Sequence, residues 1–235
     1  MDTAGKVAIG VSILAAAVTG VGVVMITRKS GLGRASRASA SVPRPLAETE
    51  VATPEGKVVR TYHKKSLPIK ERLAIIQGLI AKGTSGEDLP YLRGLALRIT
   101  QHCEARDDTC EAKAIYDYVR ENVRYTGDIA PHKLANGKVE SVDLFQSART
   151  TLEMGGGDCD DHAGVVATLA ILNGIEARLR VTSPYFLGRD NYTHIYPVLG
   201  LPKGSPEKWI SADTTLPGDN FGREVKFAKK LDVIA

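Results

Sequence analysis

The sequence predicts an α+β domain behind an amino-terminal transmembrane helix, and three observations lead to this fold class. An apolar run over residues 7–26 has the length of a membrane span. Residues 68–123 carry apolar side chains at helical spacing, whereas residues 177–214 alternate as strands do. Helices followed by strands favour an antiparallel sheet that packs on a buried helix.

The composition is that of a globular protein with a core of its own. Of the 235 residues, 43% are hydrophobic and 25% are charged, which excludes a disordered chain. The formal net charge is +4, and the five basic side chains between residues 27 and 45 account for all of it. The remainder is nearly neutral, so we expect no nucleic-acid partner.

Residues 7–26 are apolar or small apart from one serine and one threonine, and three glycines offer a surface for a partner helix. A cleaved signal peptide is the alternative. Its small-x-small site at residues 38–40 lies beyond four basic residues, which argues against cleavage. We therefore expect a single-pass membrane protein whose anchor, residues 1–27, lies in a lipid bilayer of a host or of a virion.

Residues 28–60 are rich in Ser, Ala, Arg and Pro, so we expect a basic flexible linker, followed by one domain over residues 61–235. Basic residues after the helix favour a cytoplasmic domain. A disulfide between Cys103 and Cys110 would indicate the opposite side. Both the side of the membrane and the pairing of these two cysteines stay open.

Within the domain the sequence predicts helices at about residues 68–85, 87–102 and 110–123, with their apolar stripes in the core. A long irregular stretch to residue 154 follows, and a loop of that length is expected to form one wall of a cleft. Strands are predicted at 177–182, 192–199 and 208–214. His63, His102 and His132 are expected in loops or at the surface.

A glycine run, residues 155–157, leads to Cys159 at the start of an apolar helix that stops at Gly174. The amino terminus of a helix favours a thiolate. Downstream, His194 and Asp213 lie in strand-like segments, so they could supply the base and the carboxylate that orients it. The aspartates that flank the cysteine oppose ionisation of the thiol. His162 is the weaker candidate for the base, because it shares the cysteine's own helix.

The run Gly-Gly-Gly-Asp-Cys-Asp-Asp-His-Ala, the Thr193-His194-Ile195 segment and residues 209–215 resemble the transglutaminase-like superfamily, above all its bacterial and phage cysteine peptidases. The resemblance covers about residues 68–216. It implies a papain-like core with Cys159 as nucleophile, His194 as base and Asp213 as orienting carboxylate. By analogy with papain-like enzymes, Gln146 is expected to donate to the oxyanion. Thr214 departs from the family, which commonly has proline there. No metal and no cofactor are implied.

Two functions are consistent with these features. The first is a membrane-anchored cysteine peptidase or amidase that acts through a thioester on a peptide, a protein or a peptidoglycan stem. If an amine replaces water, the same intermediate gives a transglutaminase, and the sequence does not separate these outcomes. The second is a membrane-embedded structural or interaction protein, for example of a phage particle, that keeps the fold with little or no activity.

Overall fold

The computed structural model describes residues 42–65, 67–127, 132–133, 137–184 and 192–235. The segment predicted to cross a membrane lies outside these ranges. Within them, the search for a helix long and apolar enough to span a bilayer finds none.

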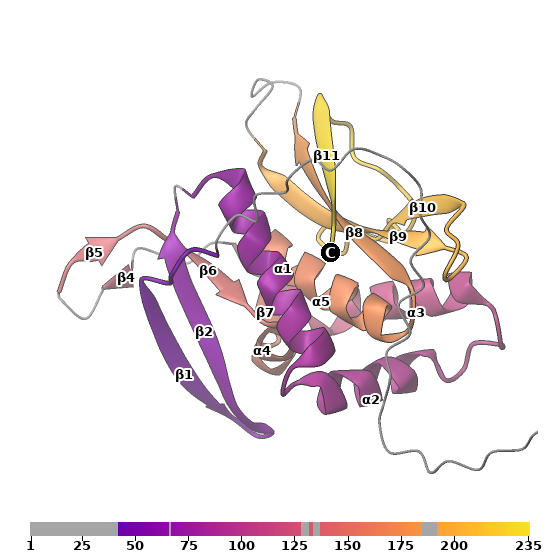
Figure 1. The fold of residues 1–235 in the computed structure, drawn as a ribbon, viewed down its shortest axis with the longest axis horizontal. Helices are drawn as coiled ribbons and strands as arrows, with labels where there is room; N and C mark the ends of the chain where they lie inside the picture. The colour runs from indigo at the N-terminus through magenta and orange to yellow at the C-terminus, as the bar shows by residue number, and fades with distance from the viewer. Residues whose placement is uncertain (1–41, 66, 128–131, 134–136, 185–191) are drawn as a thin grey trace, which may run out of the picture. The chain divides into compact units, whose positions relative to one another are not determined.

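Four helices surround the helix that begins at the cysteine, α5 (Cys159–Leu172). Residues 160–163 and 165–170 of α5 are all buried, so the helix is covered on every side and lies in the interior. Its neighbours in Figure 1 are α1 (Ile69–Ser85), α2 (Leu89–Thr100), α3 (Asp108–Asn122) and α4 (Ala148–Met154). The three predicted helices and the buried cysteine helix are therefore confirmed.

One face of α5 is covered by a four-stranded antiparallel sheet of order β10-β9-β8-β11. Its strands are β8 (Glu176–Ser183), β9 (His194–Leu201), β10 (Lys208–Ser211) and β11 (Lys229–Ile234). The first three confirm the predicted antiparallel sheet on the cysteine helix. The fourth, β11, has little apolar alternation because most of its side chains face solvent, so only its pairing with β8 defines it.

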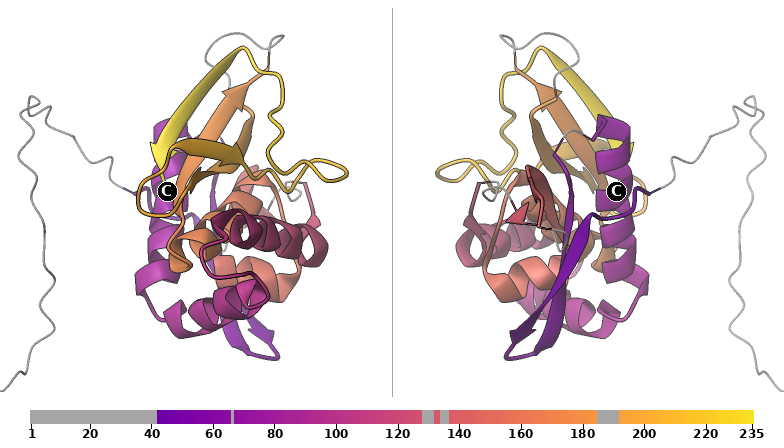
Figure 2. Two further views of the ribbon diagram at one scale, coloured as in Figure 1. Left: turned by 90° about the vertical axis from the view of Figure 1, so that its right-hand side faces the viewer. Right: turned by 90° about the vertical axis from the view of Figure 1, so that its left-hand side faces the viewer.

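A second antiparallel sheet has the order β1-β2-β6 and is built from β1 (Ala47–Thr53), β2 (Gly56–Lys64) and β6 (Val142–Gln146). Residues 47–60, which the sequence placed in a flexible linker, are thus a β-hairpin. The partner of this hairpin is β6, about 80 residues further along the chain, and a pattern within the hairpin does not reveal such a partner. In both views of Figure 2 the hairpin points away from the four-stranded sheet.

The stretch predicted to be irregular, residues 124–154, contains β6 and α4 together with short strands. These are β3 (Arg124–Tyr125), β4 (His132–Lys133) and β5 (Val139–Glu140); β3 pairs in parallel with β7 (Gly156–Gly157). His63 of β2 was expected at the surface but is buried, with its ring edge-on to Phe145. β2 and β6 pack against α4, and β6 also packs against α1. This packing explains why His63 and the residues of β6 are buried.

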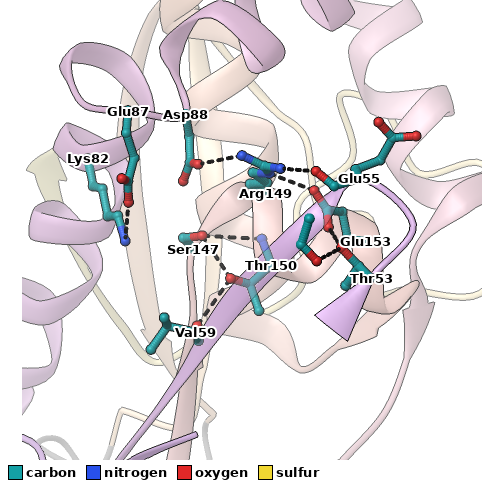
Figure 3. Close-up of polar contacts among 11 residues, drawn as sticks. Thr53, Glu55, Val59, Lys82, Glu87, Asp88, Ser147, Arg149, Thr150 and Glu153 are labelled. Atoms are coloured by element: carbon teal, nitrogen blue, oxygen red, sulfur yellow. Dashed lines mark hydrogen bonds and ion pairs between the residues drawn. The ribbon is translucent and has the colours of Figure 1, made fainter. Parts of the chain in front are cut away.

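Arg149 joins the hairpin to the helices (Figure 3). Its guanidinium donates to the carbonyl oxygen of Glu55 at 2.8 Å and to the carboxylate of Glu153 at 2.6 Å, and it lies 3.3 Å from the carboxylate of Asp88 at the start of α2. One side chain on α4 therefore holds the turn of the hairpin and the beginning of α2.

Cys103 and Cys110 form a disulfide across the turn between α2 and α3. The pairing that the sequence left open is present in the structure. A bonded pair of this kind is typical of proteins that fold in an oxidising compartment.

Candidate active site

Two glycines of the run, Gly155 and Gly157, have different structural roles. Gly155 ends α4 in the left-handed conformation, with φ of +64°, which a residue without a Cβ adopts at low cost. At Gly157 a Cβ would lie 2.5 Å from the Cβ of Asp161. Asp158 then caps α5 and Asp161 closes the capping box. Cys159 is placed as the first helical residue by these local features.

His194 and Asp213 are hydrogen-bonded to each other, with 2.6 Å between His194 Nε2 and Asp213 Oδ2. The other oxygen, Oδ1, accepts from the backbone N–H of Thr215 at 3.1 Å and from its hydroxyl at 2.7 Å. Burial by itself raises the pKa of Asp213, but these hydrogen bonds outweigh it and hold the pKa below its usual range. Asp213 is therefore a buried, ionised carboxylate that fixes the imidazole ring.

Cys159 and His194 line one small cavity of about 60 Å³ between α1, α5 and β9. Apolar side chains make up most of its remaining wall, and the polar members are Arg72, Asp160 and Thr193. All three cysteines of the chain lie in the described part, and Cys159 alone is free. The structure thus brings together the three residues expected for nucleophile, base and orienting group.

The environment of Cys159 favours the thiol over the thiolate. Burial raises the pKa of Cys159 most, and the carboxylates of Asp158 and Asp160 raise it further; a backbone hydrogen bond with Ile195 and the charge of Arg72 lower it. The net direction is upward. The flanking aspartates therefore oppose ionisation of the Cys159 thiol, as the sequence suggested. The thiol can lose its proton only to a base within reach.

Gln146 lies at the end of β6, outside the cavity that Cys159 and His194 share. Its amide nitrogen donates to Asp161 Oδ2 at 2.8 Å and to the carbonyl oxygen of Gly156 at 3.1 Å. Its backbone N–H donates to Asp161 Oδ1 at 2.8 Å. In this arrangement Gln146 joins β6 to α5, and its role as an oxyanion donor stays a prediction.

His162 does not line the cavity either. It is buried, its Nδ1 lies 2.9 Å from the hydroxyl of Thr214, and burial lowers its pKa. Thr214, the residue that departs from the family pattern, thus supplies a partner that proline could not. The hydrogen bond from Thr215 to Asp213 could be expected from the sequence, because an aspartate often accepts from the N–H two residues on. The contact between Thr214 and His162 could not.

Among the described residues, two clusters have the residue types of a metal site. Asp158, Asp160 and Asp161 each offer an oxygen within 4.8 Å of the others. Asp161 accepts from Gln146 on both oxygens, and Asp160 Oδ2 lies 3.8 Å from a nitrogen of Arg72. The second cluster contains the two cysteines of the disulfide, which are not thiolate ligands.

Comparison with known proteins identifies one family. Residues 93–214 match the sequence profile of the transglutaminase-like superfamily. No curated protein matches the chain. Among solved structures, a candidate cysteine protease from Cytophaga hutchinsonii is 16% identical with a TM-score of 0.40, covering 73% of this chain and 62% of that one. A candidate protease from Parabacteroides distasonis is 14% identical with a TM-score of 0.38, covering 60% and 29%.

The chain therefore spans less than two thirds of the length of either solved structure. The profile, by contrast, spans more than half of the chain and includes Cys159, His194 and Asp213. The chain belongs to the transglutaminase-like superfamily.

Proposed function

We propose that the protein is a thiol hydrolase, a cysteine peptidase or amidase, with Cys159 as nucleophile, His194 as base and Asp213 as the group that orients the base. The observation that carries the proposal is the 2.6 Å hydrogen bond from His194 Nε2 to Asp213, beside a cavity that Cys159 also lines. This bond leaves Nδ1 as the ring nitrogen that can accept the proton of the thiol.

Formation of the thioester and its hydrolysis each need two proton transfers at His194. Nδ1 takes the proton of Cys159, and the sulfur attacks the carbonyl carbon of a peptide or carboxamide. The C–N bond breaks as the imidazolium returns the proton to the leaving amine, which leaves a thioester. Water, activated by the same nitrogen, then attacks the thioester and releases the acid and the thiol. The N–H groups at the amino terminus of α5 are suitable donors for the oxyanion.

Burial and the neighbouring aspartates raise the pKa of Cys159, and this determines when the proton moves. Because burial and two aspartates hold the sulfur in its thiol form, we expect no resident thiolate, and the proton moves to His194 during attack. Ionised Asp213 stabilises the imidazolium that results. Whether water or an amine takes the acyl group depends on access to the thioester, so transglutamination uses the same residues.

Alkylation of the full chain with iodoacetamide under non-reducing conditions tests the proposal, because Cys159 is the sole free thiol. We expect Cys159→Ala to lose the label, and His194→Ala to react at least about tenfold more slowly at pH 7.5. His102→Gln, a change at an exposed histidine, should react as the parent does. Equal rates for the parent and His194→Ala would refute the assignment of the base.

Products are identified by incubating the chain with peptide libraries, with and without an amine donor, and comparing masses with those of Cys159→Ala. Cleavage or deamidation that requires Cys159 supports a hydrolase, and an amine adduct supports acyl transfer. The library should include a peptidoglycan stem peptide, because we propose this class of substrate beside peptides and proteins.

A structural or interaction protein that keeps this fold is the second candidate, and the half-buried, acid-flanked thiol of Cys159 favours it. A folded chain that forms no product with any library would support this role. For either function we propose that residues 7–26 anchor the chain in a lipid bilayer, which co-sedimentation of the full chain with vesicles, compared with a chain lacking residues 1–41, would test.

A further inference from the structure

Arg72 of α1 reaches into the cavity that holds Cys159 and His194. One guanidinium nitrogen lies 3.2 Å from Asp143 Oδ2 on β6, and the other lies 3.8 Å from Asp160 Oδ2 on α5. The planar group also lies over the ring of Phe145, with 5.9 Å to the ring centroid. A single side chain thus joins three elements next to the candidate nucleophile.

Both carboxylates that Arg72 contacts are almost fully buried, with 2% of Asp143 and 3% of Asp160 exposed. Buried carboxylates need a countercharge, because water does not solvate them. Arg72 occupies the core-facing stripe of α1, beside Ile69, Leu73 and Ile76 on the cavity wall. A charged residue at such a position is explained by the two aspartates it meets.

The other ionisable groups near Cys159 are mainly acidic. At the start of α5 they are Asp158, Asp160, Asp161 and His162; the others are Asp143 of β6, Tyr192 before β9, His194 of β9 and Asp213 after β10. Among the described residues that line the cavity, Arg72 is the one permanent cation. Its charge therefore opposes the field of the aspartates at the sulfur.

Building on the proposed function, we propose that Arg72 is a positioning residue that neutralises Asp143 and Asp160, so that a thiolate can form on Cys159 beside them. Its position on α1, 87 residues before the cysteine, gives no motif in the sequence. A merely structural ion pair would join α1 to β6 and α5 without affecting the ionisation of the thiol. The two roles are separated by a pH profile.

The experiment measures the rate of iodoacetamide alkylation of Cys159 between pH 6 and 10 in the full chain and in Arg72→Gln, which keeps a hydrogen-bond donor but no charge. We expect the rise of the rate with pH to move up by about one pH unit, and the rate at pH 7.5 to fall about tenfold, as for loss of a nearby opposite charge. Arg72→Lys keeps the charge and should recover most of the rate.

Arg149→Gln is the matched control, because Arg149 also pairs with two carboxylates but lies outside the cavity. It should weaken the fold and leave the pH profile unchanged. In an Asp160→Asn background, Arg72→Gln should move the profile less than in the parent, since one of the charges that Arg72 neutralises is gone.

A profile for Arg72→Gln that coincides with the parent, in a chain whose circular dichroism spectrum is unchanged, would overturn the inference and leave the proposed function intact. Should Arg72→Gln not fold, Arg72→Met, which fills the space of the side-chain stem without a charge, takes its place: a profile that moves up in pH supports the inference, and one that coincides with the parent contradicts it. Failure of the proposed function itself appears differently, as a parent profile that does not depend on His194.

Discussion

Gly157 is the residue on which the position of the nucleophile depends most directly. The Asp161 side chain occupies the space that a Cβ would need, 2.5 Å away, and Asp161 in turn accepts hydrogen bonds from Gln146. We expect Gly157→Ala to destabilise the fold by about 1–3 kcal/mol, because the capping box must shift. Thermal unfolding followed by circular dichroism measures the change.

Gly164→Ala is the control for this prediction, because a Cβ there meets nothing within 4 Å and the residue lies in α5, the helix that contains Asp161. It should be neutral or stabilise by about 0.5–1 kcal/mol, as expected for alanine in place of glycine in a helix. If both variants lose the same stability, the contact with Asp161 is not the cause.

At the same scale, sequence reasoning found the residues whose chemistry is distinctive and missed those that act through contact. Cys159 follows a glycine run and precedes an apolar helix, which is a local signal. The roles of Arg72 and Thr214 depend on side chains that meet them from other elements. Gln146 was expected at the oxyanion by analogy with papain-like enzymes; its amide contacts Asp161, and the oxyanion role stays a prediction.

Among the elements, the β1–β2 hairpin differs most from the expectation. The hairpin pairs with β6 to form a three-stranded sheet, and Arg149 holds its turn. A chain that begins at residue 61 would lose β1 and residues 56–60 of β2, so that residues 61–64, which pair with β6, become an exposed edge without β1. We expect this chain to aggregate or to unfold at lower temperature than a chain that begins at residue 42.

Size-exclusion chromatography and thermal melts of the two truncated chains measure this difference. The matched variant is Arg149→Gln in the longer chain, which should lower the melting temperature by an intermediate amount. Equal stability of both truncated chains would mean that residues 42–60 are a dispensable tether, as the sequence composition had suggested.

For the whole molecule, buried and paired carboxylates predict stability that is highest at mildly acidic pH. Burial and Asp158 raise the pKa of Asp160, so its contribution is present below about pH 3.9 and is lost as pH rises through the raised value. Asp232 has the opposite sign: hydrogen bonds from Arg180 lower its pKa, so its contribution is present above about pH 3.9 and is lost on acidification.

Melting temperatures between pH 4 and 8 test this dependence. Asp160→Asn should melt about 2–4 °C higher than the parent at pH 8 and should differ little at pH 4. Asp232→Asn, which loses its pair with Arg180, should melt lower than the parent at pH 7. A pH-independent effect of Asp160→Asn would show that its ionisation does not limit stability.

The sequence by itself determined the helices, the three strands after them, the placement of Cys159 at a helix start and the membership of the superfamily. These follow from local patterns, namely apolar periodicity and a glycine run, together with a motif. Only the tertiary structure decided the bond between His194 and Asp213, the pairing of the hairpin with β6 and the reach of Arg72 to the cavity. Each of these joins residues distant along the chain, and the energy of such a contact depends on the packing that brings the two partners together.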